Sequence, residues 1–360
     1  MKVLYIDDRL PCREIGYGFP RAADIVAALR GYAAEVVVWP TEGPGETVQP
    51  VPEEVFVDAD LVWVSRTRNV EVNIQALLSR RHDQICIFDI EAIGSERLEQ
   101  MMCRTEPDSP TPDSVQALEK RERACIAAAD IVVAVNRRDA RKLASQWKAP
   151  HVLVVGHEHE PLASPRGFAE RRGILFVGGF YKLPCPNEDA LTFLLEEIMP
   201  LSPSRLLVNH PLTVAGHNAD ILLDRPIGKL MKAYKVHVVS SPSSLARLYD
   251  RARAGVIPTR IAAGMPFKGT EMVCMGLPFV TTAVIADQLG MAGTGFDDPI
   301  RFARMLEALL EDEEAWRDLH QELMFIRQAY APGVVTQQIG EVLNVASQLL
   351  HSDGSAEVTI

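Results

Sequence analysis

The sequence is poor in positive charge and has no long hydrophobic run. Its 360 residues include 37 lysines and arginines against 48 aspartates and glutamates, a formal net charge of −11. Because nucleic-acid binding rests on cationic contacts to phosphates, this balance argues against a nucleic acid partner. No run approaches the roughly 18 apolar residues of a membrane-spanning helix. The N-terminus leads directly into an apolar segment at residues 3–6, so we expect no signal peptide.

Paired cysteines are also missing. The chain has no Cys–x–x–Cys pair, and its cysteines stand singly at Cys12, Cys86, Cys103, Cys125, Cys185 and Cys274. This usage predicts reduced thiols and a cytoplasmic location. The dinucleotide fingerprint G-x-G-x-x-G is absent as well. Gly16 and Gly18, between the first predicted strand and helix, form too short a motif for it, and we expect them in a loop that faces a cleft.

Metal-binding patterns are scarce. The run from His157 to Glu160 contains two histidines, but its spacing matches no zinc-enzyme pattern. The one Asp–x–Asp triplet, Asp58 to Asp60, comes before a predicted strand. Ligands in parallel sheets bind beyond the carboxyl ends of the strands, so this triplet lies at the wrong end. We therefore expect no metal and no bound cofactor.

Strands alternate with helices along the whole chain, which predicts parallel α/β domains. In the first half we expect strands at residues 2–6, 35–39, 60–64, 85–89, 131–135 and 151–155, and in the second half at 173–178, 205–208, 235–239, 254–257 and 278–282. We expect helices at 19–29, 113–128 (with Asp113 as N-cap), 187–199, 298–310, 314–330 and 335–350. The polar segment 156–172 carries Pro and Gly and predicts a hinge between the halves. This divides the chain into domains at 1–160 and 161–334, with a disordered tail at 351–360.

The stretch 257–282 carries most of the functional information. A loop with Arg260 and Gly264 leads from an apolar strand to a short helix, where Lys268 and Glu271 stand three residues apart on one face. A guanidinium, an ammonium and a helix N-terminus together suit a diphosphate. A carboxylate one turn further on can accept hydrogen bonds from a ribose diol. The pattern predicts a pocket for a nucleoside diphosphate with a sugar attached.

This stretch resembles the donor site of retaining GT-B glycosyltransferases, specifically glycosyltransferase family 4 (glycosyl transferases group 1). The matching positions are Pro258, Arg260, Gly264, Lys268, Glu271, Gly276, Pro278, Val280 and Thr282. Residues 172–180 with Pro186 and Asn187 resemble the opening of the family's donor domain, residues 245–253 the helix before the donor strand, and residues 88–92 with Arg97 the acceptor side of one branch. The chain departs from the pattern at Ala263, where many members carry a first glutamate, and at Phe267 and Met272.

The resemblance implies a GT-B fold, in which two Rossmann-like doubly wound domains face each other across a cleft and the helix at 335–350 crosses back to the first domain. It implies a hexosyltransferase-type enzyme that transfers sugar from a nucleotide-sugar to an acceptor hydroxyl with retention of configuration. Arg260 and Lys268 would stabilise the leaving diphosphate without a metal, and Glu271 would hold the ribose. Gly264, with Gly16 and Gly18 from the first half, would lie near the phosphates. Gly178 and Gly179 would either bring their backbone close to a phosphate or simply turn the chain after a strand. Lys182 would either reach the same diphosphate or be solvated.

The acceptor side of the cleft is predicted from the end of a buried strand. Asp89 and Glu91 follow apolar residues, and a buried acid is costly unless it is used or paired. One of them is expected to orient or deprotonate the acceptor hydroxyl, whereas a structural ion pair with Arg97 is the alternative. The acceptor itself stays open between a glycan, a lipid-linked molecule and a small molecule.

Several alternatives remain at this point. A catalytically silent GT-B protein that binds a sugar nucleotide or a partner glycosyltransferase fits the missing glutamate at Ala263. Lys268 and Glu271 could be a surface pair. The start of the chain resembles a receiver domain, but the strand at 60–64 ends without the required acid. The basic segment 137–148 could touch an anionic membrane, or it could be a solvated helix that turns Leu143 and Trp147 to the core.

Overall fold

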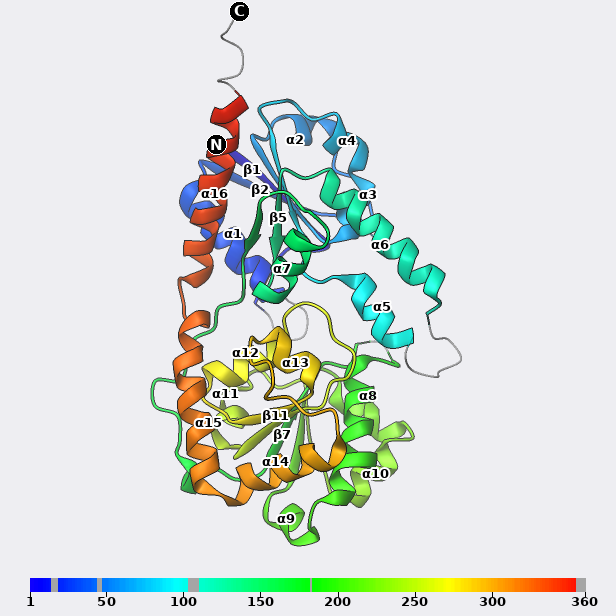
Figure 1. Cartoon of the computed structure of the whole chain (residues 1–360), viewed down its shortest axis with the longest axis vertical. Helices are drawn as coiled ribbons and strands as arrows, with labels where there is room; N and C mark the ends of the chain where they lie inside the picture. The colour runs from blue at the N-terminus through cyan, green and yellow to red at the C-terminus, as the bar shows by residue number, and fades with distance from the viewer. Residues whose placement is uncertain (14–18, 44–46, 103–109, 182, 354–360) are drawn as a thin grey trace, which may run out of the picture.

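The computed structural model describes residues 1–13, 19–43, 47–102, 110–181 and 183–353, which form two α/β domains, one above the other in Figure 1. The strands of the first domain are β1 (Lys2–Asp7), β2 (Glu35–Pro40), β3 (Leu61–Ser65), β4 (Ile85–Asp89), β5 (Ile131–Ala134) and β6 (Val152–Val154). They pair in parallel in the order β2-β1-β3-β4-β5-β6. Its helices are α1 (Pro20–Tyr32), α2 (Glu53–Val57), α3 (Thr67–Val72), α4 (Ile74–Leu78), α5 (Gly94–Met102), α6 (Pro112–Ala127) and α7 (Arg137–Ser145).

The second domain repeats this plan. Its strands are β7 (Ile174–Val177), β8 (Leu212–Gly216), β9 (His237–Ser240), β10 (Ala254–Ile257) and β11 (Phe279–Thr281), which pair in parallel in the order β11-β10-β7-β8-β9. Its α-helices are α8 (Pro186–Phe193), α9 (Ser204–Asn209), α10 (Gly228–Ala233), α11 (Ala246–Arg251), α12 (Phe267–Cys274), α13 (Ala283–Gln288), α14 (Pro299–Glu311) and α15 (Glu313–Ile326). Shorter turns of other helix types are η2 (Phe168–Glu170), η3 (Leu194–Ile198), η4 (Met199–Leu201), η5 (Ala219–Asp224) and η6 (Arg327–Tyr330).

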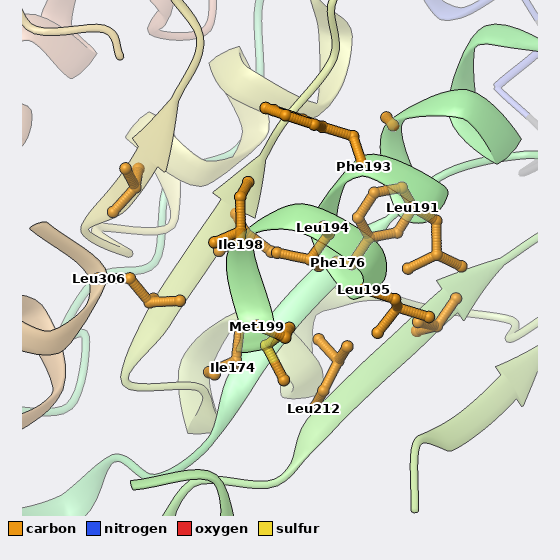
Figure 2. Close-up of a cluster of buried hydrophobic side chains, with 14 of the residues drawn as sticks. Ile174, Phe176, Leu191, Phe193, Leu194, Leu195, Ile198, Met199, Leu212 and Leu306 are labelled. Carbon is orange, nitrogen blue, oxygen red and sulfur yellow. The ribbon is translucent and has the colours of Figure 1, made fainter. Parts of the chain in front are cut away.

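Apolar clusters cover both faces of each sheet, which explains why the strands read as continuous hydrophobic runs. In the second domain, Phe176 of β7, Leu212 of β8 and Leu194 of η3 belong to one buried cluster, which Figure 2 shows. α8 passes directly into the π-helical turn η3, so the predicted helix at 187–199 holds three helix types in succession. This packing holds α8 and η3 against β7 and β8.

The last helix, α16 (Val334–Asp353), crosses from the second domain to the first and packs against α1 (Figure 1). Val335, Ile339 and Val342 are buried in the same cluster as Ile25 of α1. The helix includes residues 351–353, for which the sequence predicts disorder, and the rest of that tail, 354–360, lies outside the described residues.

The chain therefore crosses twice between the domains, and the two crossings are tied together. The Glu158 carboxylate accepts hydrogen bonds from the backbone N–H groups of Gly333 and Val335, with N···O distances of 3.0 and 3.2 Å. Gly156 N donates to Gln338 Oε1 at 2.9 Å. The predicted hinge segment 156–172 is largely irregular, but it is not simply solvated, because Arg171 within it is almost fully buried.

Two local predictions are wrong. The segment predicted as a strand at 205–208 is helix α9, and the strand is β8, which begins after Pro211. A short apolar run such as Leu206–Leu207–Val208 does not distinguish strand from helix by its pattern. The N-cap of α6 is Thr111 rather than Asp113, since Pro112 occupies the first helical position and Thr111 and Ser114 satisfy each other's backbone N–H groups.

Candidate functional site

The second sheet reverses its strand order between β7 and β10. From β7 the chain continues through β8 to β9 on one side, and then crosses to β10 and β11 on the other. Such a switch point leaves a crevice at the carboxyl ends of the two central strands. Gly178 and Gly179 follow β7 directly, and the loop after β10 leads to α12. The loops that carry the predicted motif residues therefore begin at one crevice.

Lys268 stands in the first turn of α12 and points toward α8. Its Nζ donates a hydrogen bond to Asn187 Oδ1 at 2.6 Å and lies 5.4 Å from the centre of the Phe176 ring. Asn187 Nδ2 in turn donates to the carbonyl of Gly179 at 2.9 Å. Burial lowers the pKa of Lys268 to about 8, because the ammonium loses water and no carboxylate among the described residues compensates.

Glu271 follows one turn later on the same face of α12. Its Oε2 accepts a hydrogen bond of 2.7 Å from Tyr249 Oη on α11. Burial raises the pKa of Glu271 to about 7, and the Tyr249 bond opposes that rise. The two motif side chains are therefore not a surface ion pair, since each has its own partner from another helix.

A cavity of about 580 Å³ opens over these side chains. Its wall includes Gly178, Gly179 and Gly216 at the ends of β7 and β8, with Lys268 and Glu271 on α12. Gly216 has φ +144°, and a Cβ there would lie 2.0 Å from the carbonyl oxygen of Gly178. Only glycine lets these two strand ends approach so closely. The volume lies within the roughly 300–1,000 Å³ range of small-molecule sites.

Arg260 does not join Lys268 in this cavity wall. Its guanidinium pairs with Asp189 on α8 (Nη2–Oδ1 2.7 Å) and lies 4.3 Å from the centre of the Phe193 ring. Glu197 adds a longer contact of 3.6 Å to the same guanidinium. The sequence spacing places Arg260 just after the carboxyl end of β10, as the motif requires. The direction of its side chain is set by Asp189 of α8 and Glu197 of η3.

Gly264 lies where the second domain touches the first. It has φ +78°, and a Cβ there would come within 2.6 Å of the Glu91 carbonyl oxygen. Asn136 Nδ2 donates to the Gly264 carbonyl at 3.2 Å, and Gln100 Oε1 accepts from Ala262 N at 2.7 Å. The loop after β10 is thus fitted against the ends of β4, α5 and β5 in the first domain.

A second cavity, of about 220 Å³, lies at this contact. It is bordered by Glu91, Ala263 and Gly264, by the hinge residue His157, and by the arginines of the first domain: Arg21, Arg66 and Arg97. It shares the wall residue Pro20 with the larger cavity. The predicted acceptor residue Glu91 and Gly264, in the loop after β10, therefore meet at one small hollow between the domains.

Asp89 and Glu91 have different surroundings. Asp89 is fully buried and accepts from both Nη atoms of Arg21, at 2.8 and 3.0 Å. Its partner is Arg21 and not Arg97, which the sequence suggested. Glu91 lies 2.8 Å from Arg66 Nε and borders the smaller cavity, and burial raises its pKa. Asp89 lines neither this cavity nor the larger one.

Three predicted residues cannot be placed. Gly16, Gly18 and Lys182 lie outside the described residues. Within the described part of the chain, no cluster of three or more His, Cys, Asp or Glu residues has the arrangement of a metal site. There, too, no helix is long and apolar enough to cross a membrane. Leu143 in the basic helix α7 and Trp147 just beyond its end are both buried, as one reading of the sequence predicts, and Arg138 and Lys142 pair with Glu96.

Sequence reasoning missed the residues that support the motif. Asn187 and Tyr249 hold Lys268 and Glu271, although each lies within a segment already noted as family-like. Nothing in the sequence indicated that the hinge histidines His157 and His159 contact α12. His159 Nε2 is 2.7 Å from Thr270 Oγ1 on α12, and Phe267 packs its ring edge against both His157 and His159. Burial lowers the pKa of His159 to about 4, so this contact is made by a neutral ring.

Solved structures with the same two-domain arrangement identify the fold. Sucrose-phosphate synthase from Thermosynechococcus elongatus superimposes with a TM-score of 0.69 at 14% identity, over 96% of this chain and 99% of that one. This is the GT-B fold. Anabaena HepE in complex with UDP and glucose gives 0.69 at 13% identity, over 96% and 100% of the two chains. The GT-B trehalose 6-phosphate synthase from Burkholderia multivorans gives 0.64 at 12%, over 100% and 99%. The predicted fold class is confirmed.

The second GT-B domain has a further likeness at the level of sequence. Residues 171–312 match the family described as Glycosyl transferases group 1. This range holds Gly178, Asn187, Lys268 and Glu271, and thus the whole wall of the larger cavity that the second domain supplies. No curated protein matches the chain. Fold and domain together support a glycosyltransferase of the GT-B type.

Proposed function

We propose that the protein is a retaining glycosyltransferase of family 4, which moves a hexose from a nucleotide-sugar to an acceptor hydroxyl without a metal ion. The observation that carries the proposal is the pair Lys268 and Glu271. Both project from one face of α12 into the same cavity, beside the glycines that end β7 and β8. The ammonium and the unobstructed backbone of the glycines suit a diphosphate, and the carboxylate suits the ribose that follows it.

The donor is proposed to be a UDP-sugar. Two structural neighbours support this choice, because Anabaena HepE was solved with UDP and glucose and Staphylococcus aureus TarM with UDP. In this chain the diphosphate would meet Lys268 Nζ and the backbone at Gly178 and Gly179, and Glu271 would accept from the ribose hydroxyls. Lys182 would add a second ammonium.

The chemistry follows from charge. When the bond between the sugar and the diphosphate breaks, negative charge grows on the leaving phosphate, and a fixed ammonium beside it lowers the barrier. Lys268 is suited to this role, since its pKa of about 8 keeps it mostly protonated near neutral pH. Arg260 is proposed as a second cation. To bind the phosphate, the Arg260 guanidinium would have to leave the Asp189 carboxylate, with which it is now paired. Donor binding would therefore include breaking this ion pair.

The acceptor is proposed to bind at the smaller cavity. Glu91 borders this cavity and would orient the acceptor hydroxyl or take its proton. Asp89 would act indirectly, because its bidentate pair with Arg21 holds Arg21 beside Glu91 (Nη1–Oε1 3.5 Å). Retention of configuration is part of the proposal on the strength of the family resemblance.

A transfer assay tests the proposal. The protein is incubated with a panel of UDP-hexoses and an extract from the producing cell, and sugar-bearing products are detected by mass spectrometry. The expected result is a product whose mass exceeds that of its acceptor by one hexose residue, formed in the presence of EDTA and formed roughly 10²- to 10³-fold more slowly by Lys268→Ala. One observation favours a silent GT-B protein instead: Ala263 offers only a methyl group to the smaller cavity. Tight UDP binding with no transfer to any acceptor would select that alternative.

A further inference from the structure

Arg97 is a cation of the interdomain cavity without an acidic partner among the described residues. It stands on α5 and borders the smaller cavity opposite the donor loop. Its Nη2 donates a long hydrogen bond, 3.5 Å, to the carbonyl oxygen of Ala263. Partial desolvation lowers the pKa of Arg97, and among the described residues no carboxylate counters that effect. Arg97 is solvent-exposed, and no carboxylate of the described residues neutralises its guanidinium.

The other arginines of this cavity are different, because each already has its counter-ions. Arg21 is paired with Asp89 at 2.8 Å. Arg66 contacts Asp7, Asp8 and Glu91. These two guanidiniums therefore serve to hold the ends of β1, β3 and β4 together. An anionic ligand would therefore gain little binding energy from Arg21 and Arg66, and more from Arg97.

We propose that the smaller cavity takes an acceptor sugar with an anionic substituent, a phosphate or a carboxylate, and that Arg97 binds this substituent. The inference rests on the proposed function and specifies its acceptor. A guanidinium offers a planar fork of N–H donors that matches both anions in a bidentate manner. The cavity volume of about 220 Å³ is small for a ligand site, so it suits a single sugar unit rather than a long glycan.

The donor diphosphate is a poorer candidate for Arg97. The side chain that is suited to the diphosphate, Lys268, borders the larger cavity, and Arg97 does not border that cavity. Glu91, the proposed partner of the acceptor hydroxyl, borders the same hollow as Arg97. An acceptor bound there would thus have its reacting hydroxyl near Glu91 and its anionic group near Arg97.

Calorimetry on the full chain saturated with UDP tests this assignment. The probes are glucose 6-phosphate, glucuronate, inorganic phosphate and, as the neutral reference, glucose. At least one anionic sugar is expected to bind roughly 10-fold or more tightly than glucose, the scale of a charge-assisted hydrogen bond. Phosphate and carboxylate are distinguished by which of the two sugars binds more tightly.

Arg97→Gln should remove that preference and leave UDP affinity unchanged, and Arg97→Lys should restore part of it. Arg141→Gln, on the exposed side of α7, is the matched control and should behave as the native chain. The proposal is overturned if no anionic probe binds more tightly than glucose at millimolar concentration, or if Arg97→Gln weakens UDP instead of the sugar. A failure of the proposed function would appear separately, as absence of UDP binding to the native chain.

Discussion

The side-chain oxygen of Asn187 accepts a 2.6 Å hydrogen bond from the ammonium of Lys268, and the same amide binds the Gly179 carbonyl at 2.9 Å. One side chain therefore joins the loop after β7 to the first turn of α12. These are the two segments to which the proposed function assigns the diphosphate. The hydrogen bond to Asn187 sets the direction in which the Lys268 side chain points. Asn187 is therefore a positioning residue.

Asn187→Ala should lower kcat by roughly 10- to 100-fold and change KM for the donor much less. The reason is that a misdirected Lys268 loses part of its stabilisation of the leaving group, an interaction strongest in the transition state. Steady-state kinetics with varied donor measures the split. Asn209→Ala, on exposed α9 in the same domain, is the matched control. An equal loss in the control, or a change in KM alone, would contradict this role.

Lys268→Ala should lower kcat by roughly 10²–10³, the scale of losing a charge partner of the transition state, and EDTA should leave the native rate intact. Arg260→Ala should give a loss of similar size only if Arg260 leaves Asp189 during the reaction. The pair of variants thus reports on that exchange. A native enzyme that EDTA stops and a divalent ion restores would refute the metal-free proposal.

UDP affinity should pass through a maximum between about pH 7 and pH 8. The lower limit arises because burial raises the pKa of Glu271 to about 7, and only the ionised carboxylate accepts from both ribose hydroxyls. The upper limit arises because burial lowers the pKa of Lys268 to about 8, above which the ammonium is lost. Calorimetry from pH 5.5 to 9 measures the profile.

Variants of Glu271 and Lys268 show which residue causes the acidic and which the alkaline loss of UDP affinity. Glu271→Gln should weaken binding by roughly 1.5–3 kcal/mol at pH 8, as expected for a hydrogen bond to a charged group, and should flatten the acidic limb. Lys268→Arg should remove the alkaline limb. The titration of UDP itself is common to all three proteins and cancels in the comparison. Identical profiles for native and variant proteins would exclude both residues from the site.

The sequence predicted the fold and the common helix face of Lys268 and Glu271 because both depend on short-range patterns. Lys268 and Glu271 share a face of α12 by helical spacing alone, and both border the cavity. The partners of the site residues could not be predicted from the sequence, because they lie far away along the chain. Lys268 bonds to Asn187, 81 residues earlier, and Asp89 pairs with Arg21, 68 residues earlier. Arg260 illustrates the same limit: its backbone position follows from β10, whereas its direction follows from Asp189 on α8. Pairings between distant segments need the folded chain.

Gly264→Ala should impair both stability and activity, and Gly290→Ala only stability. Both glycines have similar positive φ, +78° and +76°, so each alanine costs roughly 1–2 kcal/mol of backbone strain. A Cβ at Gly264 would also come within 2.6 Å of the Glu91 carbonyl, whereas at Gly290 nothing lies within 4 Å. The donor loop must therefore move away from the first domain in Gly264→Ala alone. Urea unfolding and kcat/KM are the two measurements, and equal kcat/KM for both variants would show that this contact is not needed for catalysis.

The final prediction concerns the position of the two domains. Apart from the two chain crossings, the donor side is held to the first domain by a few polar contacts, among them Arg138 Nε to Asp287 Oδ2 at 2.7 Å. Because Glu158 ties the two crossings together, the domains are expected to rotate about that edge as one hinge. UDP-sugar should add contacts across the cleft and reduce the radius of gyration measured by small-angle X-ray scattering. Asp287→Ala should enlarge the radius of the free protein, and donor should reverse much of that increase. Asp224→Ala removes an exposed acid elsewhere in the same domain and should leave the radius unchanged. If Asp287→Ala and the native chain gave the same curves, with and without donor, the contact at α13 would have no part in holding the cleft closed.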